Sequence, residues 1–153
     1  MNWELLKRAI YYNNRHENKM SSEPKYLARI VTTLIGAICH GILVLARTID
    51  PQTGRSVLFG HKVTALPLSL DRSNYLLNSR LLRRNTIAYS CYVEEEVRAC
   101  LESPDDFSHG PSILVPYVVS DGNLITSRWS GEEALFSECF ADALEQRICA
   151  EKE

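Results

Sequence analysis

One cysteine stands in a setting typical of a catalytic nucleophile. Residues 37–41 are Ala-Ile-Cys-His-Gly, so small residues, Ala37 and Gly41, lie two positions before and two positions after Cys39. This spacing is typical of a nucleophile elbow, a sharp strand-to-helix turn in which strand and helix pass so closely that the flanking side chains must be small. A thiol in such a turn lies at the start of a helix, where backbone N–H groups favour the thiolate. We therefore predict that Cys39 is a nucleophile.

The residues after Cys39 complete the candidate site. His40 is adjacent, and its imidazole can hydrogen-bond the thiolate or serve as an acid or base. The first backbone N–H groups of the next helix, at Gly41, are expected to bind an oxyanion. A cysteine after an apolar strand is by default a small buried hydrophobe. The functional interpretation therefore depends on the strand before Cys39 and the helix after it.

The elements that would position Cys39 can be inferred from the apolar pattern. Residues 31–38 (VTTLIGAI) are largely apolar and rich in β-branched side chains, as in a strand buried on both faces. The other elements that we expect are helices over 40–48, 69–82 and 93–101, strands over 62–66, 113–119 and 123–127, and a last helix that ends near residue 148. This order predicts an α/β fold in which helices cover a mostly parallel sheet.

Two local signals concern the C-terminal part of the chain. Asp121-Gly122 stands between two apolar runs, which predicts an antiparallel hairpin whose turn positions both have positive φ. Ser130 is followed three residues later by Glu133, as in a capping box, so we expect the last helix to begin there.

The composition is that of one soluble globular domain. The 153 residues include 17 Lys and Arg and 19 Asp and Glu, so the net charge of −2 gives no field that would attract nucleic acid or a membrane surface. Charged residues interrupt the N-terminal stretch where a secretory signal would be apolar, and the longest apolar run is too short to cross a bilayer. These features predict a cytoplasmic protein.

The remaining polar residues give no sign of a cofactor or metal. The five cysteines are widely spaced and include no CxxC pair, which argues against disulfides and structural zinc. Neither GxGxxG nor GxxxxGK[ST] occurs, so no nucleotide cofactor is expected. The run of three glutamates at 94–96 is expected to be a solvated helix face, and His61 and His109 are expected to be solvated loop residues.

Four stretches resemble the ThiJ/PfpI family of the class I glutamine amidotransferase-like superfamily. They are GAICHGILVLA (36–46), GHKVTALP (60–67), YVEEEV (92–97) and VVSDGNLITSRWSGEEALFSECFADAL (118–144). They occur in the family's order and spacing. The resemblance implies a flavodoxin-like three-layer sandwich, here lacking its N-terminal strands, plus the antiparallel hairpin. It divides the chain into an atypical N-terminal helical or loop segment, 1–31, and a ThiJ/PfpI-like domain, 32–148.

The same resemblance implies a reactive Cys39 with His40 as its partner. Asp71 stands where an aspartate orients the histidine in some relatives, although an aspartate in a first helical turn also simply favours the helix dipole. The family's reported activities are cofactor-independent glyoxalase or deglycase action, amidase or peptidase action, chaperoning and oxidative-stress sensing. A homodimer is expected on the same ground.

One departure from the family leaves three functions open. In related proteins an acidic residue on an early loop hydrogen-bonds the cysteine, and no glutamate before Cys39 follows a strand as that residue does. The first hypothesis is an enzyme that acts on a small carbonyl or amide through Cys39. The second is a redox-sensing or chaperone-like stress protein. The third is a catalytically impaired fragment, which the missing acid favours.

Overall fold

The computed structural model describes residues 33–82 and 91–150. The chain divides into two units, Met1–Thr32 and Thr33–Glu153. The first unit, and with it the helical or loop segment expected over 1–31, lies outside the described residues. All of the described residues therefore belong to the second unit.

A three-stranded sheet forms the centre of this unit. Its strands are β1 (Ile35–Ile38), β2 (Val118–Asp121) and β3 (Leu124–Ser127), in the order β1-β3-β2. β1 runs parallel to β3, with Ile35 opposite Leu124 and Ile38 opposite Ser127. β2 runs antiparallel to β3. The expected hairpin is thus confirmed, and the fold is α/β, with one parallel and one antiparallel strand pair.

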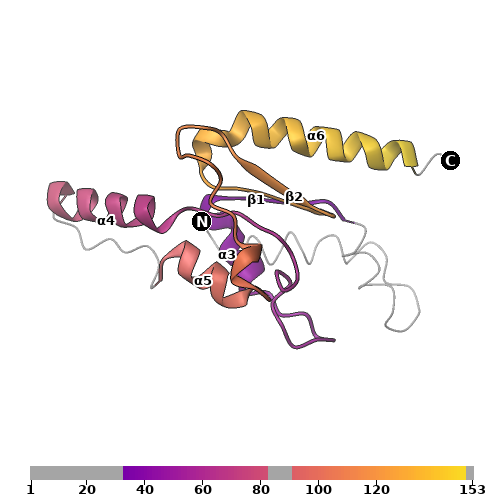
Figure 1. Ribbon diagram of the computed structural model, residues 1–153, viewed down its shortest axis with the longest axis horizontal. Coiled ribbons are helices and arrows are strands. Elements are labelled where there is room, and N and C mark those ends of the chain that lie inside the picture. The colour runs from indigo at the N-terminus through magenta and orange to yellow at the C-terminus, as the bar shows by residue number, and fades with distance from the viewer. Residues whose placement is uncertain (1–32, 83–90, 151–153) are drawn as a thin grey trace. The chain divides into compact units, whose positions relative to one another are not determined.

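Helices cover both faces of the sheet, as Figure 1 shows. The α-helices of the described residues are α3 (Ile42–Ala46), α4 (Leu68–Leu82), α5 (Val93–Cys100) and α6 (Glu133–Ala150), with 3-10 turns at Cys39–Gly41, Pro104–Asp106 and Ser130–Glu132. α6 packs on β3 and β2, while α3 packs on α5. The helices expected over 69–82 and 93–101 and at the C-terminus are confirmed, and the one expected over 40–48 is shorter.

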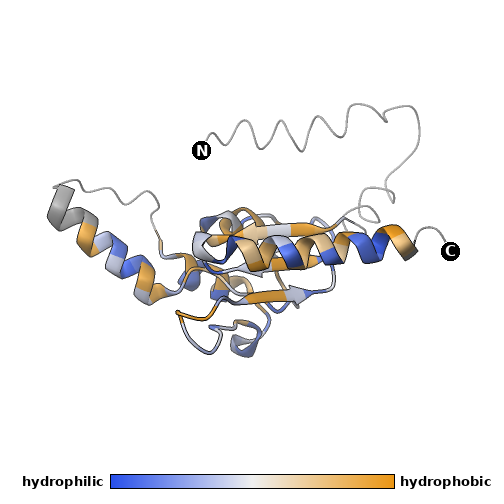
Figure 2. Cartoon of the chain, turned by 90° about the horizontal axis from the view of Figure 1, so that it is seen from above, coloured by the Kyte–Doolittle hydropathy of each residue, from blue (hydrophilic) through white to orange (hydrophobic). Residues whose placement is uncertain are grey.

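The alternation of side chains along β1 explains these two layers. Successive residues of a strand point to opposite faces. Ala37 belongs to the hydrophobic core that α3 and α5 share, whereas Gly36 lies against the rings of Phe136 and Phe140 on α6. A Cβ at Gly36 would lie 2.7 Å from Phe136, so glycine is needed for α6 to approach the strand. Figure 2 shows apolar residues along the strands and on α6.

The hydrophobic core lies on the side of the sheet away from α6. Val93 and Val97, which lie four residues apart on α5, are fully buried in it. The other buried members come from β1, α3, β3 and the segments between them: Ala37, Ile42, Leu43, Ala46, Leu58, Val63, Ala65, Leu66, Phe107 and Leu124. Burial of this apolar set, at about 25 cal/mol per Å², provides the main stabilisation of the unit.

The prediction of a strand over 62–66 is wrong. This segment forms a single parallel bridge, between Val63 and Phe107, and no ladder. Thr64 is fully buried, but its backbone N–H donates to the Thr126 hydroxyl at 2.9 Å and its own hydroxyl donates to the Ser108 carbonyl at 2.6 Å. A side chain therefore satisfies the N–H that a ladder would have paired, which is the requirement for burying a backbone.

Two local details also differ from expectation. The hairpin turn is formed by Gly122 and Asn123, and of these only Gly122 has positive φ, +61°, as in a type II′ turn. The predicted capping box at Ser130 is absent, since Trp129 precedes the 3-10 turn and no side chain caps it. Within the described residues, no helix combines the length and apolarity that a membrane span requires.

Candidate active site

Cys39 lies in a strained turn between β1 and α3. Ile38 ends the strand in an extended conformation, and Cys39 has φ +56°, in the left-handed region. It is the one non-glycine residue with positive φ among residues 33–82 and 91–150. Such a conformation costs about 1–3 kcal/mol and persists where the surrounding structure enforces it, commonly at functional sites. The strand-cysteine-helix turn predicted from the sequence is therefore present.

The thiol and the neighbouring imidazole are in contact. Cys39 Sγ lies 3.2 Å from His40 Nδ1, and both side chains are half-buried. Burial raises the pKa of the Cys39 thiol, and the negative charge of Asp71 raises it further. The hydrogen bond from the backbone N–H of His40 lowers this pKa, but by less than burial raises it. The expectation that the turn favours a thiolate is thus wrong, because desolvation outweighs the N–H groups of a helix only five residues long. The resting sulfur is therefore a thiol, and His40 is the side chain in contact with it.

The negative charge of Asp71 raises the pKa of the Cys39 thiol, and its carboxylate is hydrogen-bonded to the backbone of α5. It stands in the first turn of α4, and its Oδ2 accepts a hydrogen bond from the backbone N–H of Val93, the first residue of α5, at 3.2 Å. This hydrogen bond ties α4 to α5. The role of Asp71 in orienting His40, which the resemblance implied, stays a prediction.

Gly41 differs from its predicted role in one respect. Its φ of −59° is helical, so the backbone does not require glycine there. A Cβ at this position would meet no described atom within 4 Å. Close passage of strand and helix therefore does not explain the small residue. A side chain at position 41 would therefore point into space free of described atoms.

An ion pair that we did not predict as part of the site lies at the same edge of the sheet. Ile38 and Ser127 are opposite each other at the ends of parallel strands, so Cys39 and Arg128 both come directly after neighbouring strand ends. Active sites of parallel α/β sheets gather at this carboxyl edge. Arg128 and Glu132 are entirely buried there, with side-chain exposures of 0% and 1%.

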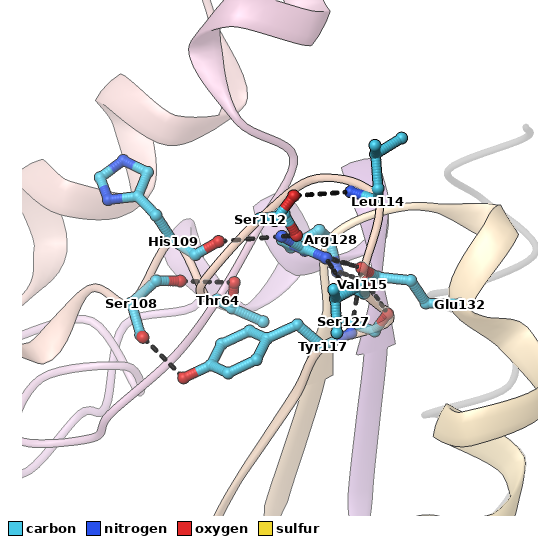
Figure 3. A network of polar contacts seen from close by, with 10 residues as sticks. All are labelled: Thr64, Ser108, His109, Ser112, Leu114, Val115, Tyr117, Ser127, Arg128 and Glu132. Carbon is cyan, nitrogen blue, oxygen red and sulfur yellow. Dashed lines mark hydrogen bonds and ion pairs between the residues drawn. The ribbon is translucent and has the colours of Figure 1, made fainter.

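The Arg128 guanidinium holds a whole loop in place (Figure 3). Its Nε donates to Glu132 at 2.7 Å, and Nη2 also bonds this carboxylate. Nη1 donates to the carbonyls of His109 and Ser112 at 3.0 Å each, and Nη2 donates to that of Val115 at 2.6 Å. Residues 109–115 are therefore fixed to the end of β3 by a single side chain.

Glu132 completes this network as the acceptor. Its carboxylate receives the Ser127 hydroxyl at 2.7 Å and the backbone N–H groups of Arg128 and Tyr117 at 2.8 and 3.2 Å. Burial raises the pKa of Glu132, but the hydrogen bonds from Arg128 and Ser127 together outweigh it, so the pKa is lowered. No buried side-chain nitrogen or oxygen in the described part of the chain lacks a partner. The pair is thus fully satisfied.

His109, which we expected to be solvated, is paired with a carboxylate. Its Nε2 lies 2.8 Å from Oε1 of Glu94, and its ring packs edge-on against Phe107. Glu94 is only 12% exposed, so the expected solvated face of α5 is wrong at this residue. Its other oxygen accepts the backbone N–H of Leu68 at 2.7 Å. No sequence signal indicates this pair, because 15 residues separate its members and no shared element connects them.

Two further groups of titratable residues are paired with each other and not with Cys39. His61 lies 3.2 Å from Asp121 at the hairpin turn, so the expectation of a solvated side chain is again incomplete. Arg47 bonds Glu96, which also bonds the Cys91 thiol. Among the described residues, no group of three His, Cys, Asp or Glu side chains is placed to hold a metal ion.

Comparison with known proteins gives a fold and no family. No protein-family model and no curated protein matches the chain. The crystallographic structure of APC35852 is similar, at 24% identity and a TM-score of 0.59, over 74% of this chain and 45% of that one. The X-ray structure of the 24 kDa Rapid Encystment Protein (REP24) of Francisella tularensis is similar at 21% identity and a TM-score of 0.58, over 77% and 47%.

Both similarities are too distant to carry a function. At identities below 25% they show a shared fold alone. The chain spans slightly less than half the length of either protein. Its chemistry must therefore be inferred from its own residues.

Proposed function

We propose that this protein is a cysteine-dependent enzyme of the ThiJ/PfpI type that acts on a small carbonyl or amide substrate. The observation that carries the proposal is the left-handed turn at Cys39 with its Sγ 3.2 Å from His40 Nδ1. A strained nucleophile in contact with a base is the arrangement that covalent catalysis requires. The α/β fold is compatible with the flavodoxin-like sandwich of that family, and a homodimer belongs to the same proposal.

The raised pKa of Cys39 determines the first step. Because the resting group is a thiol, His40 must remove its proton as the sulfur attacks. The sulfur then bonds the carbonyl carbon, and the carbonyl oxygen takes the negative charge, with the backbone N–H of Gly41 as the proposed donor. An aldehyde gives a hemithioacetal after protonation of this oxygen. An amide gives a thioester once the protonated amine has left.

Turnover by point variants tests this proposal. We expect hydrolysis of an activated ester such as p-nitrophenyl acetate, or conversion of methylglyoxal to the hydroxy acid, to be lost in Cys39→Ser. His40→Gln should reduce it at least about 100-fold. Cys139→Ser, which removes a half-buried thiol from α6, is the matched control and should keep full activity. Turnover that survives Cys39→Ser would contradict the proposal.

A catalytically impaired protein is the second candidate, and one observation favours it. Asp71 is engaged by the backbone of Val93, and its charge opposes the thiolate. In that case none of the substrates would turn over, whereas the proposed enzyme turns them over through Cys39. A redox sensor is less favoured, because sensor cysteines have lowered pKa values and that of Cys39 is raised.

A further inference from the structure

His109 has the contacts of an oriented base. A carboxylate oxygen only accepts hydrogen bonds, so the contact of 2.8 Å with Glu94 places the imidazole hydrogen on Nε2. In the neutral imidazole Nδ1 is then an acceptor, and no hydrogen bond to it is found among the described residues. Glu94 is itself fixed by the N–H of Leu68, and Phe107 packs on the ring. The imidazole is nevertheless 52% exposed, so water and a small substrate can reach it.

The backbone of His109 is fixed to the edge of the sheet that carries Cys39. Its carbonyl accepts a hydrogen bond from the buried Arg128, while its ring points away from that network, as Figure 3 shows. Arg128 comes after Ser127, which lies opposite Ile38.

Glu94 is next in sequence to a residue that bonds α4. Its neighbour Val93 donates to Asp71, the carboxylate whose charge acts on the Cys39 thiol. His109 itself is bonded, through Arg128, to the edge of the sheet that also carries Cys39.

A carboxylate-oriented imidazole is the arrangement that water activation uses. His109 has this arrangement, because Glu94 fixes both its tautomer and the position of its ring. We infer that His109, oriented by Glu94, is the base that activates water to release the acyl group from Cys39. This inference rests on the proposed function, in which Cys39 forms a thioester.

The step balances without an oxidant or a further reactant. Nδ1 of His109 takes a proton from water as the water oxygen bonds the thioester carbon. The carbon–sulfur bond then breaks, and the sulfur leaves with the electron pair. The thiolate takes up the proton that water lost, so the products are a carboxylic acid and the free Cys39 thiol.

Burst kinetics with p-nitrophenyl acetate separate the two halves of the reaction. Acylation of Cys39 releases one equivalent of nitrophenol per site, and the later steady rate reports deacylation. In His109→Ala we expect an unchanged burst and a steady rate about 100-fold lower, the low end of the range for a general base. The acetylated Cys39 peptide should accumulate, as read by mass spectrometry, and added imidazole should restore the steady rate.

Two further variants make the test specific. His61→Ala removes another carboxylate-paired histidine, the partner of Asp121, and should leave both phases unchanged. Glu94→Gln keeps an oxygen for the Leu68 N–H but loses the charge that supports an imidazolium, so it should slow deacylation alone. Glu94→Gln therefore measures the same slowing of deacylation if His109→Ala fails to fold.

The outcomes distinguish this inference from the proposed function. A steady rate in His109→Ala and Glu94→Gln within twofold of the wild type, after a normal burst, would overturn the role of His109 alone. A wild-type protein with no burst that depends on Cys39 would overturn the proposed function and this inference together.

Discussion

Arg128 and Glu132 form an ion pair that is sealed from solvent at the end of β3. Besides the partner carboxylate, the guanidinium bonds three carbonyls of the 109–115 loop. A buried pair is weak evidence of net stabilisation, but removal of one partner leaves an uncompensated charge. Loop and strand end therefore depend on both residues together.

Arg128→Met should destabilise the protein by about 3–5 kcal/mol, because it leaves Glu132 buried without its cation. Urea unfolding followed by circular dichroism measures this loss. Arg72→Met is the matched control, since its pair with Glu95 is more than half exposed, and it should cost less than about 1 kcal/mol. Equal losses in the two variants would contradict the role assigned to burial.

The same pair should make stability depend on acid pH. The pKa of Glu132 is lowered in the folded protein, so its stabilisation is fully present above the ordinary glutamate pKa of about 4.3. It should be lost as the pH falls from there towards the lower folded value. The difference in unfolding free energy between wild type and Glu132→Gln should therefore shrink below about pH 4.3. A difference that stays constant from pH 7 to pH 3 would be inconsistent with this linkage.

Two glycines with positive φ should respond differently to alanine. Gly122 has φ +61° with open space around it, so Gly122→Ala costs backbone strain alone, about 1 kcal/mol. Gly110 has φ +72°, and a Cβ there would lie 2.6 Å from the Tyr117 ring, so Gly110→Ala should cost more. Thermal unfolding of both variants measures the difference, and an equal loss would show that Tyr117 moves aside freely.

The strain at Cys39 should be visible in stability. Cys39→Gly should be about 1 kcal/mol more stable than Cys39→Ala, because glycine adopts φ +56° without the Cβ penalty. At Ala99, inside α5, glycine should instead be about 1 kcal/mol less stable than alanine. The same sign at both positions, measured by urea unfolding, would argue against a strained turn.

Alkylation of Cys39 should be slow at neutral pH. Its raised pKa means that little thiolate exists at pH 7, and the rate should rise through a midpoint above the free-thiol value of about 8.5. Iodoacetamide labelling with peptide mass spectrometry follows each cysteine separately. The exposed Cys149 serves as the internal reference. Fast labelling of Cys39 at pH 6 would contradict the raised pKa.

The sequence was informative where a pattern is local. The turn at Cys39 and the hairpin around Gly122 can be predicted from neighbouring residues, and the α5 helix from its apolar pattern. The prediction of a strand over 62–66 fails, although these residues are as apolar as a strand. Their hydrogen bonds come from one bridge and from the Thr126 side chain. Whether such groups pair in a ladder depends on distant partners.

The polar contacts of the site were the least predictable part. Arg128 pairs with Glu132 at the start of the last helix, and such a pair can be anticipated from the sequence. The complete burial of Arg128 has no sequence signature. Glu94 and His109 meet across 15 residues of sequence, and His109 lies on a loop whose carbonyls Arg128 binds. The direction of the Cys39 pKa shift was also missed, since desolvation depends on what covers the thiol.

The pairing of Ile35 with Leu124 determines the order in which the fold can assemble. β2 and β3 are adjacent in sequence and can form their hairpin locally, whereas β1 must wait for a partner made long after it. Non-local pairing of this kind loses more loop entropy and is slow. On the ribosome, β1 leaves the exit tunnel well before β3 exists. The residues of the turn that strains Cys39 are thus synthesised well before the strand that fixes their conformation.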